Sequence, residues 1–420
     1  MIGLLLIGLF ALIFVSAALA PMESLGWWAG WGAKPPKKNE LAEKEAAAST
    51  AEPEADFYLV YLSGIGAISG TSVPAEEYPF IYGLRKRLPK AEIISDIYPY
   101  SVTNNGLTGQ RAFSWAWRGL EKIGQTPGSK LAIMTMVINL RNAFQLFVSA
   151  DRRYGPVYNL GIANEVYSGL LRHGMHPRSS KPIIMLGWSG GGQIAIGSVE
   201  YLAGLPGPIY VISIGGMLSD DPGLKKVDHL WHLYGVADPL QALGTVFFAG
   251  RWPIMPQSPW NQAMADGRID MICLGQYGHN GKGNYFDMVT PVTNDKKGRT
   301  HGQKTLDTIV RILNEEGLVS DEDAAVAWKM SVPLETDGVP EVIAQRMEEA
   351  AREREAKERE KEEKTGVAIE SDPVAEADSP LEVVVAARKE EAAAADATPN
   401  GTASQGTEAV VTAGEEERAS

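Results

Sequence analysis

Apolar and polar residues alternate in regular blocks between residues 56 and 318. Short apolar runs rich in β-branched and aromatic residues predict buried strands, and stretches with apolar residues every three or four positions predict helices. We expect strands at 57–70, 91–100, 182–187, 208–218, 227–238 and 268–278. We expect helices at 76–89, 110–124, 131–150, 160–172, 193–202 and 301–317, with a polar loop at 151–159. This order predicts an α/β fold with a mostly parallel, doubly wound sheet covered by helices on both faces.

The pattern before residue 56 is different. Residues 2–20 are uninterruptedly apolar and, as a helix, would be about 28 Å long, close to the thickness of a bilayer's hydrocarbon core. Pro21 and three interfacial tryptophans follow, so we expect residues 1–32 to be a transmembrane anchor. Lysines come only after the apolar run, at 34, 37 and 38, which predicts a single-pass protein with a cytoplasmic domain.

A cleaved signal peptide is the alternative interpretation of the N-terminus. Residues 18–20, Ala-Leu-Ala, resemble a cleavage site, and cleavage would make the protein secreted. The run lacks a basic segment before it, is longer than usual for a signal peptide, and is followed directly by a proline. These three features favour an uncleaved anchor. Residues 33–55 are rich in Pro, Ala and charge and indicate a linker.

The C-terminal part, residues 319–420, is charged and low in apolar residues. Residues 341–364 favour a solvated helix of alternating charge, and residues 366–420 have the composition of a disordered segment. The chain's net charge of −13 and the lack of a basic stripe exclude nucleic acid as an expected partner. A solubilising or tethering role is expected for this tail, and a partner for it is unknown.

Candidate chemistry centres on the sequence GWSGG at residues 187–191. Ser189 stands between an apolar run and a helical pattern, within a G-x-S-x-G motif. A serine at a sharp turn between a strand and a helix is a nucleophile elbow. Gly187 and Gly191 would let the strand and the helix approach each other closely. The first amide of the helix, that of Gly190, would face a negative charge that develops beside Ser189.

An activated serine also needs a base and an acid. His279 follows a strand, within a glycine-containing loop, and is the preferred base; His301, at the start of the last helix, is the alternative. Asp238 ends a strand before a proline and is the preferred acid. Two further aspartates, at 220 and 221, are held in reserve. His229 and His232 lie inside a strand and are expected to be structural.

A second amide for the oxyanion hole is expected from the loop after the first strand. The sequence there is SGIG, and Gly64 and Ile65 are both candidates, to act together with Gly190. Gly64 and Gly66 after a strand also resemble a dinucleotide-binding motif, but the third glycine and the acidic partner are not at the required spacing. We therefore expect no cofactor. The single cysteine, Cys273, and the lack of a clustered acidic or His motif lead us to expect no metal.

The motifs GWSGGG, GVADP and QYGHNG, in that order, resemble the α/β-hydrolase fold superfamily over residues 56–318. The resemblance implies Ser189 as nucleophile, Asp238 as acid and His279 as base. It also implies a serine hydrolase that acts on an ester, thioester or amide. The oxyanion loop departs from the HGGG type of many lipases and esterases, which leaves the subfamily open. The rival interpretation is a membrane-tethered binding module with an idle hydrolase-like fold.

The expected substrate is a small-molecule carboxylic ester, of hydrophobic or lipid-like character. The apolar segment 131–148 and a few aromatic residues could line a cavity for an acyl group; they are Phe144, Phe147, Trp115 and Trp252. Ordinary core packing is the alternative explanation of these residues. The predicted anchor adds the bilayer as a place where the enzyme would meet such a substrate.

Overall fold

In the computed structural model, the described residues are 54–103, with gaps at 68, 70–72 and 75, and 132–330, plus isolated positions between 11 and 29. The predicted helix at 110–124, the charged helix at 341–364 and the tail lie outside these residues. The predicted anchor and linker lie almost entirely outside them.

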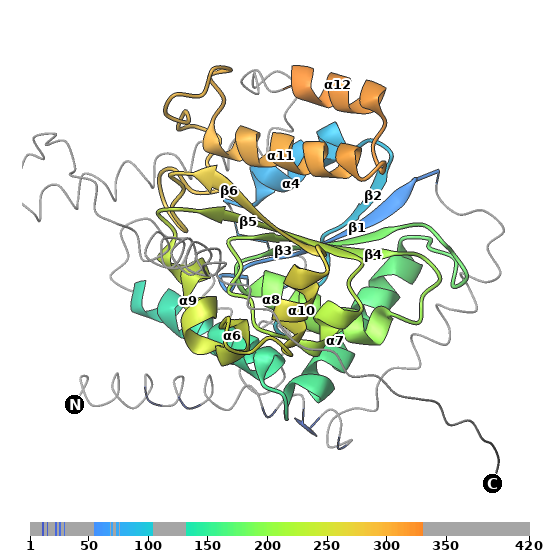
Figure 1. The fold of residues 1–420 in the computed structure, drawn as a ribbon, viewed down its shortest axis with the longest axis vertical. Helices are drawn as coiled ribbons and strands as arrows, with labels where there is room; N and C mark the ends of the chain where they lie inside the picture. The colour runs from blue at the N-terminus through green and yellow to red at the C-terminus, as the bar shows by residue number, and fades with distance from the viewer. Residues whose placement is uncertain are drawn as a thin grey trace, which may run out of the picture. The chain divides into compact units, whose positions relative to one another are not determined.

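Six parallel strands form one sheet in the order β2-β1-β3-β4-β5-β6 (Figure 1). The strands are β1 (Phe57–Leu62), β2 (Ala91–Ile94), β3 (Ile183–Trp188), β4 (Ile209–Ile214), β5 (His229–Gly235) and β6 (Ile269–Gly275). The predicted α/β architecture with a mostly parallel sheet is confirmed. Because β1 lies between β2 and β3, the strand order reverses there, and a crevice is expected at the carboxyl ends of β1 and β3.

Helices cover both faces of the sheet (Figure 1). On one face lie α4 (Tyr78–Arg87), α11 (His301–Glu315) and α12 (Asp321–Lys329). On the other lie α6 (Ala132–Ala150), α7 (Gly155–Arg172), α8 (Gly190–Leu202), α9 (Pro239–Phe247) and α10 (Pro259–Ala265). Two short 3₁₀ helices, η2 (Pro222–Lys225) and η3 (Ala249–Arg251), complete the described elements.

Alternate residues of each central strand face the two helix layers. In β1, Tyr58, Val60 and Leu62 pack into one apolar cluster, and Phe57, Leu59 and Tyr61 pack into the other. All six of these side chains are buried. A strand that is apolar on both sides suits a parallel sheet covered by helices on both faces, and burial of these side chains stabilises the fold.

Several elements differ in extent from the prediction; the strand predicted at 57–70, for example, ends at Leu62. The predicted loop at 151–159 is shorter, because α7 already begins at Gly155, with a proline in its first turn. The strand predicted at 91–100 is shorter and comprises only β2, Ala91–Ile94. This edge strand pairs with β1 over four residues. Helix α12 lies beyond the boundary predicted at residue 318 and buries Ala324 and Ala327. Helix α11, predicted at 301–317, ends at Glu315, and Gly317 just after it has φ +77°.

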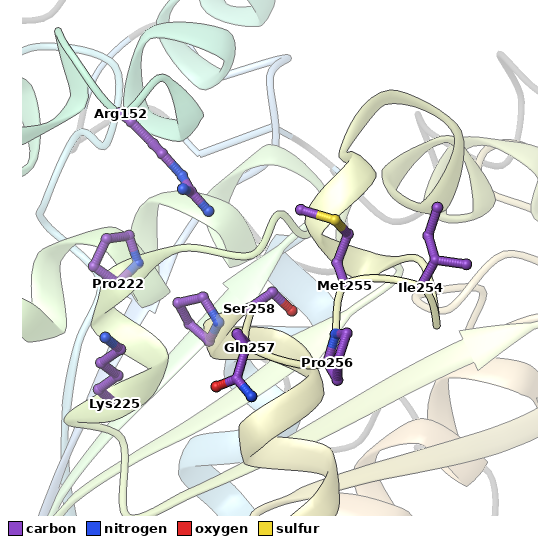
Figure 2. A pocket seen from close by; sticks show the side chains of 9 residues that line it. Arg152, Pro222, Lys225, Ile254, Met255, Pro256, Gln257 and Ser258 are labelled. Carbon is purple, nitrogen blue, oxygen red and sulfur yellow. The ribbon is translucent and has the colours of Figure 1, made fainter.

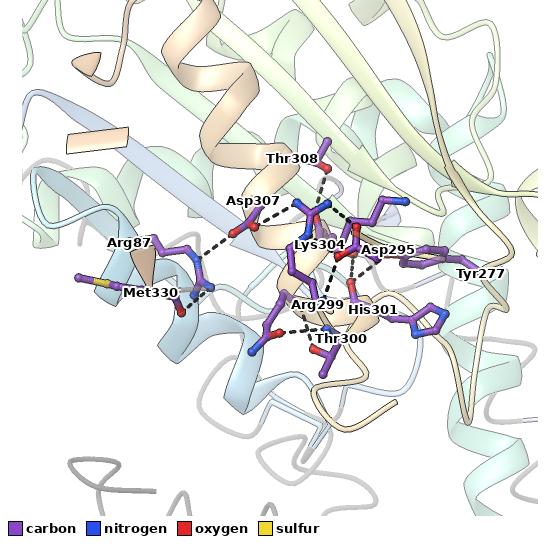
Figure 3. Close-up of polar contacts among 12 residues, drawn as sticks. Arg87, Tyr277, Asp295, Arg299, Thr300, His301, Lys304, Asp307, Thr308 and Met330 are labelled. Atoms are coloured by element: carbon purple, nitrogen blue, oxygen red, sulfur yellow. Dashed lines mark hydrogen bonds and ion pairs between the residues drawn. The ribbon is translucent and has the colours of Figure 1, made fainter. Parts of the chain in front are cut away.

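A chain of buried and half-buried charges joins α4 to α11 and to the loop before α11. Arg87 lies 3.5 Å from Asp307, and Asp307 also contacts Arg299 at 3.2 Å (Figure 3). Arg299 in turn pairs with Asp295 at 2.7 Å. Burial lowers the pKa of Arg87 from its usual value, while the neighbouring Asp307 counteracts this effect. The chain fixes α11 against α4 on the face opposite to α8.

Candidate active site

Ser189 forms the turn between β3 and α8. The strand ends at Trp188 and the helix begins at Gly190, so the serine alone makes the connection. Its backbone has φ +52° and ψ −119°, a strained conformation for any residue other than glycine. The N–H of Ser189 donates to the carbonyl of Ile214 at 2.9 Å, which continues the pairing of β3 with β4. The predicted strand–turn–helix geometry of the elbow is therefore present.

The two outer glycines of the motif are needed for space. A Cβ added at Gly187 would lie 2.5 Å from the backbone of Gly191. A Cβ added at Gly191 would lie 2.3 Å from the carbonyl oxygen of Leu62 in β1. Real Cβ atoms do not approach other atoms so closely, so the first turn of α8 can cross the ends of β1 and β3 only without side chains. This is the role that the sequence predicted for both glycines.

Ser189, His279 and Asp238 form one chain of hydrogen bonds. The Oγ of Ser189 lies 2.9 Å from Nε2 of His279. The Nδ1 of His279 lies 2.9 Å and 3.0 Å from the two carboxylate oxygens of Asp238. Asp238 follows β5 and His279 follows β6, so all three residues meet at the carboxyl edge of the sheet. Both Asp238 and His279 are buried, at 1% and 8% exposure.

The alternative candidates lie elsewhere. His301 bonds through Nδ1 to the carbonyl of Thr290 at 2.9 Å and packs on Tyr277, and Figure 3 shows it beside that ring. The reserve acids Asp220 and Asp221 have other partners: Asp220 pairs with Arg152, and Asp221 caps η2. The structure therefore brings His279 and Asp238, rather than these residues, to Ser189.

The two remaining histidines, His229 and His232, both lie on β5 and are held by other partners. His229 pairs with Asp270 at 3.1 Å. His232 is fully buried, with Nδ1 3.2 Å from the Oγ of Ser213. Burial lowers the pKa of His232 to about 3, so its imidazole is neutral in the fold. These contacts support the structural role expected for the pair.

Asp238 is held by more than the imidazole. Its Oδ1 accepts hydrogen bonds from the N–H groups of Leu240 and Gln241, at the start of α9. Its Oδ2 accepts from the hydroxyl of Tyr285 at 2.8 Å. That hydroxyl itself accepts from the N–H of Gly235 at 2.7 Å, and burial followed by the charge of Asp238 raises the pKa of Tyr285. Asp238 is thus fixed in position by four donors.

Tyr285 was not identified from the sequence. It lies six residues after His279, in a segment rich in glycine and asparagine that carries no regular pattern. The aromatic residue within GHNGKGNY was the available signal. Only the folded structure shows that the hydroxyl of Tyr285 contacts Asp238.

The turn after β1 lies against the elbow. A Cβ added at Gly64 would come within 3.5 Å of the Cβ of Ser189 and 2.6 Å of the Trp188 ring. A Cβ added at Gly190 would come within 2.9 Å of the Cγ2 of Ile65. The three residues predicted for the oxyanion hole, Gly64, Ile65 and Gly190, are therefore adjacent to the serine. Gly190 opens α8, where the first amides have no partner within the helix.

Apolar side chains of α6 lie beside the elbow and at the surface. Leu146 of α6 is buried, with its Cδ1 3.2 Å from a Cβ built on Gly190. The next residue, Phe147, is 41% exposed and meets the ring of Phe247 edge-on at 5.9 Å. Phe247 is exposed as well. Among the other predicted lining residues, Phe144 is half-buried, Trp252 is exposed, and Trp115 lies outside the described residues.

A separate surface pocket of about 580 Å³ lies between Arg152, η2 and residues 254–259 (Figure 2). Ile254 and Met255 give it apolar walls, and Lys225 adds a cationic one. None of Ser189, His279 and Asp238 lines it. The hydroxyl of Ser258 in this pocket caps α10 by accepting from the N–H of Asn261. We therefore place no chemistry there.

Within the described ranges, no group of three or more His, Cys, Asp or Glu side chains is arranged to hold a metal ion. Likewise, no helix in the described part of the chain is both long and apolar enough to cross a membrane. Comparison of the sequence with protein-family models finds no match, and a search of curated proteins finds none either.

Proposed function

We propose that the protein is a serine hydrolase that cleaves carboxylic esters through an acyl-enzyme. The observation that carries this proposal is the hydrogen-bonded chain Ser189–His279–Asp238 at a strained elbow. The order nucleophile, acid, base along the sequence, on a parallel sheet, further supports an α/β-hydrolase fold. The proposed chemistry uses side chains and backbone amides of the described residues.

In the proposed first step, Ser189 Oγ attacks the ester carbonyl carbon while His279 Nε2 takes the hydroxyl proton. The carbonyl π bond opens to a tetrahedral oxyanion, which accepts hydrogen bonds from Gly190 and from an amide of the turn after β1. His279 then returns the proton to the departing alcohol as the C–O bond breaks. Water, deprotonated by His279, attacks the acyl-enzyme in the same way, and the carboxylic acid and free Ser189 are formed.

The surroundings of the site favour a hydrophobic acyl or alcohol group. Leu146 lies beside Gly190, and the next residue, Phe147, meets Phe247 at the surface. Burying one methylene group of a substrate against such side chains is worth about 0.8 kcal/mol. This supports an ester of lipid-like character. With the apolar run at residues 2–20, we propose a membrane-anchored enzyme with a cytoplasmic hydrolase domain that takes its substrate from the bilayer surface.

The test is hydrolysis of p-nitrophenyl esters of increasing chain length by the full-length protein, with a fluorophosphonate as covalent probe. We expect a burst of one equivalent per active site and a preference for longer acyl chains. Ser189→Ala should abolish labelling, and His279→Ala should slow acylation by about 10³-fold or more. His301→Ala is the matched control and should remain active. A folded protein that no ester or fluorophosphonate acylates would contradict the proposal.

A further inference from the structure

Buried side chains hold the turn after β1 from several directions. The N–H of Ala67 donates to the carbonyl of Gly64 at 3.1 Å and closes the turn. The hydroxyl of Tyr100 donates to the carbonyl of Ser63 at 3.1 Å. The carboxyl group of Glu77 accepts hydrogen bonds from the N–H of Gly64 and the hydroxyl of Ser63. It is 1% exposed.

Asn142 of α6 makes the most extensive contact with this turn. Its Nδ2 donates to the carbonyl oxygens of Ile65, at 2.7 Å, and of Ala67, at 2.8 Å. Its Oδ1 accepts from the hydroxyl of Tyr98, at 3.1 Å, and from Arg141, at 3.0 Å. Two donors and two acceptor positions are all used, and the side chain is 0% exposed. A flipped amide would set its NH₂ group against Arg141, so the network fixes its orientation.

These contacts distinguish the two candidate amides. The N–H of Gly64 is already bonded to the carboxyl group of Glu77. The peptide group between Gly64 and Ile65 points its carbonyl oxygen toward the N–H of Ala67. Because this group is planar and trans, the N–H of Ile65 points to the opposite side. Ile65 is also the residue of the turn whose side chain meets the position of Gly190.

We infer that the N–H of Ile65, together with that of Gly190, binds the oxyanion, and that Asn142 is the positioning residue that holds Ile65 in place. This inference rests on the proposed serine-hydrolase function. Asn142 bonds the carbonyl groups on both sides of Gly66, so the turn cannot rotate its peptide planes without breaking a buried hydrogen bond. The amide is thereby fixed before the substrate arrives, which is the condition for strong oxyanion stabilisation.

The test compares Asn142→Asp with Asn159→Asp. Asn159 of α7 is also buried, and it bonds Ser149 of α6 through both its Oδ1, at 2.7 Å, and its Nδ2, at 3.0 Å. Both variants remove the amide donors of a buried asparagine, one that lies on α6 and one that is bonded to it, but only Asn142 contacts the turn. The active fraction of each full-length variant is counted by complete fluorophosphonate labelling, and rates are expressed per labelled site.

A trifluoromethyl ketone is the probe, because Ser189 would add to it and form a stable tetrahedral oxyanion. For Asn142→Asp we expect kcat to fall by about 10- to 100-fold, inhibition by the ketone to weaken by a similar factor, and KM to remain within about twofold. Asn159→Asp should change none of the three per labelled site. A purely structural role of Asn142 would lower the labelled fraction and leave the ketone affinity of the remaining sites unchanged.

Equal ketone affinities of the two variants per labelled site would overturn the inference. A parent protein that the fluorophosphonate does not label would instead mean that the proposed function itself has failed. Should Asn142→Asp not fold, Asn142→Ser and Asn159→Ser provide the same comparison. Serine keeps one donor, so the expected loss in kcat and in ketone affinity is smaller, about threefold to tenfold.

Discussion

The indole ring of Trp188 lies nearly parallel to the imidazole of His279, with ring centroids 4.6 Å apart and planes inclined by 21°. Trp188 directly precedes Ser189 and is 4% exposed. Its edges pack on Tyr285 and Phe286, so it cannot turn away. The residue before the proposed nucleophile thus also packs on the ring of the proposed base and restricts its orientation.

Trp188→Leu should therefore lower kcat by about 10-fold, since a misplaced catalytic group loses much of its advantage in proximity. Steady-state hydrolysis of the preferred p-nitrophenyl ester, normalised to labelled sites, measures the effect. Trp231→Leu is the control: Trp231 lies on β5 of the same sheet, 6% exposed and packed on Tyr210, with no contact to His279. Equal losses in the two variants would contradict an orienting role of Trp188.

Tyr285→Phe removes the hydroxyl that donates to Asp238 and accepts from Gly235. We expect a decrease in kcat of about 3- to 30-fold and a loss of about 1–3 kcal/mol in the free energy of unfolding, because a buried N–H loses its acceptor. Tyr277→Phe is matched, as Tyr277 is equally buried and its hydroxyl donates to the carbonyl of His301. It should lose stability but keep kcat. Denaturant titration and ester kinetics separate the two effects.

Gly64→Ala should destabilise the protein by about 1–3 kcal/mol through overpacking. The added methyl group would lie 2.6 Å from the ring of Trp188, which is wedged between His279 and Tyr285 and cannot yield. Gly204→Ala is the control, because a Cβ there meets nothing within 4 Å. Calorimetric melting of both variants tests this. A melting temperature of Gly64→Ala equal to that of the parent would show that the Trp188 ring has room to move.

Glu77 makes stability depend on pH. Burial raises the pKa of its carboxyl group from 4.5 to about 8, against hydrogen bonds from Tyr61 and Ser63 that lower it. Between these values the unfolded chain has released the proton and the folded chain has kept it. The free energy of unfolding should therefore be highest below pH 4.5 and decrease as the pH rises to 8.

Glu77→Gln should remove this contribution. Relative to the parent, the variant should gain at least about 1 kcal/mol in unfolding free energy between pH 5 and pH 8, the equivalent of roughly one pKa unit. Urea titrations of both proteins over this range provide the measurement. Glu76→Gln is the control for loss of a nearby charge, since Glu76 is more exposed than Glu77. Parallel stability curves for the parent and Glu77→Gln would rule the linkage out.

The fold could be predicted in outline because its strands are marked by composition. The segments that form β1, β3 and β4 are short, rich in β-branched and aromatic residues and bounded by glycine or proline. They could therefore be recognised as strands without knowledge of tertiary contacts. The start of α7 was not recognised, because Gly155 and Pro156 were assigned to a loop, although proline is also common in the first turn of a helix. Helix α12 was missed since it buries little more than two alanines.

The main site residues could be predicted because a parallel sheet brings the ends of its strands to one edge. Ser189, Asp238 and His279 each follow a strand, and that position suffices to bring them together. Glu77, Asn142 and Tyr285 could not be found in this way. Glu77 directly precedes α4, Asn142 lies on α6 and Tyr285 lies in an irregular loop, and their importance depends on burial or on hydrogen bonds to residues far away along the chain. Neither leaves a periodic signal in the chain.

The conformation of Ser189 has an evolutionary consequence. With φ +52°, the residue opposes the fold by on the order of 1 kcal/mol or more, and glycine would relieve that strain at once. A lineage that needed only the scaffold would drift readily to glycine here, because that change relieves the backbone strain. Neutral drift would therefore favour glycine at position 189, whereas a function of the hydroxyl would keep serine. The presence of serine favours a function of its hydroxyl.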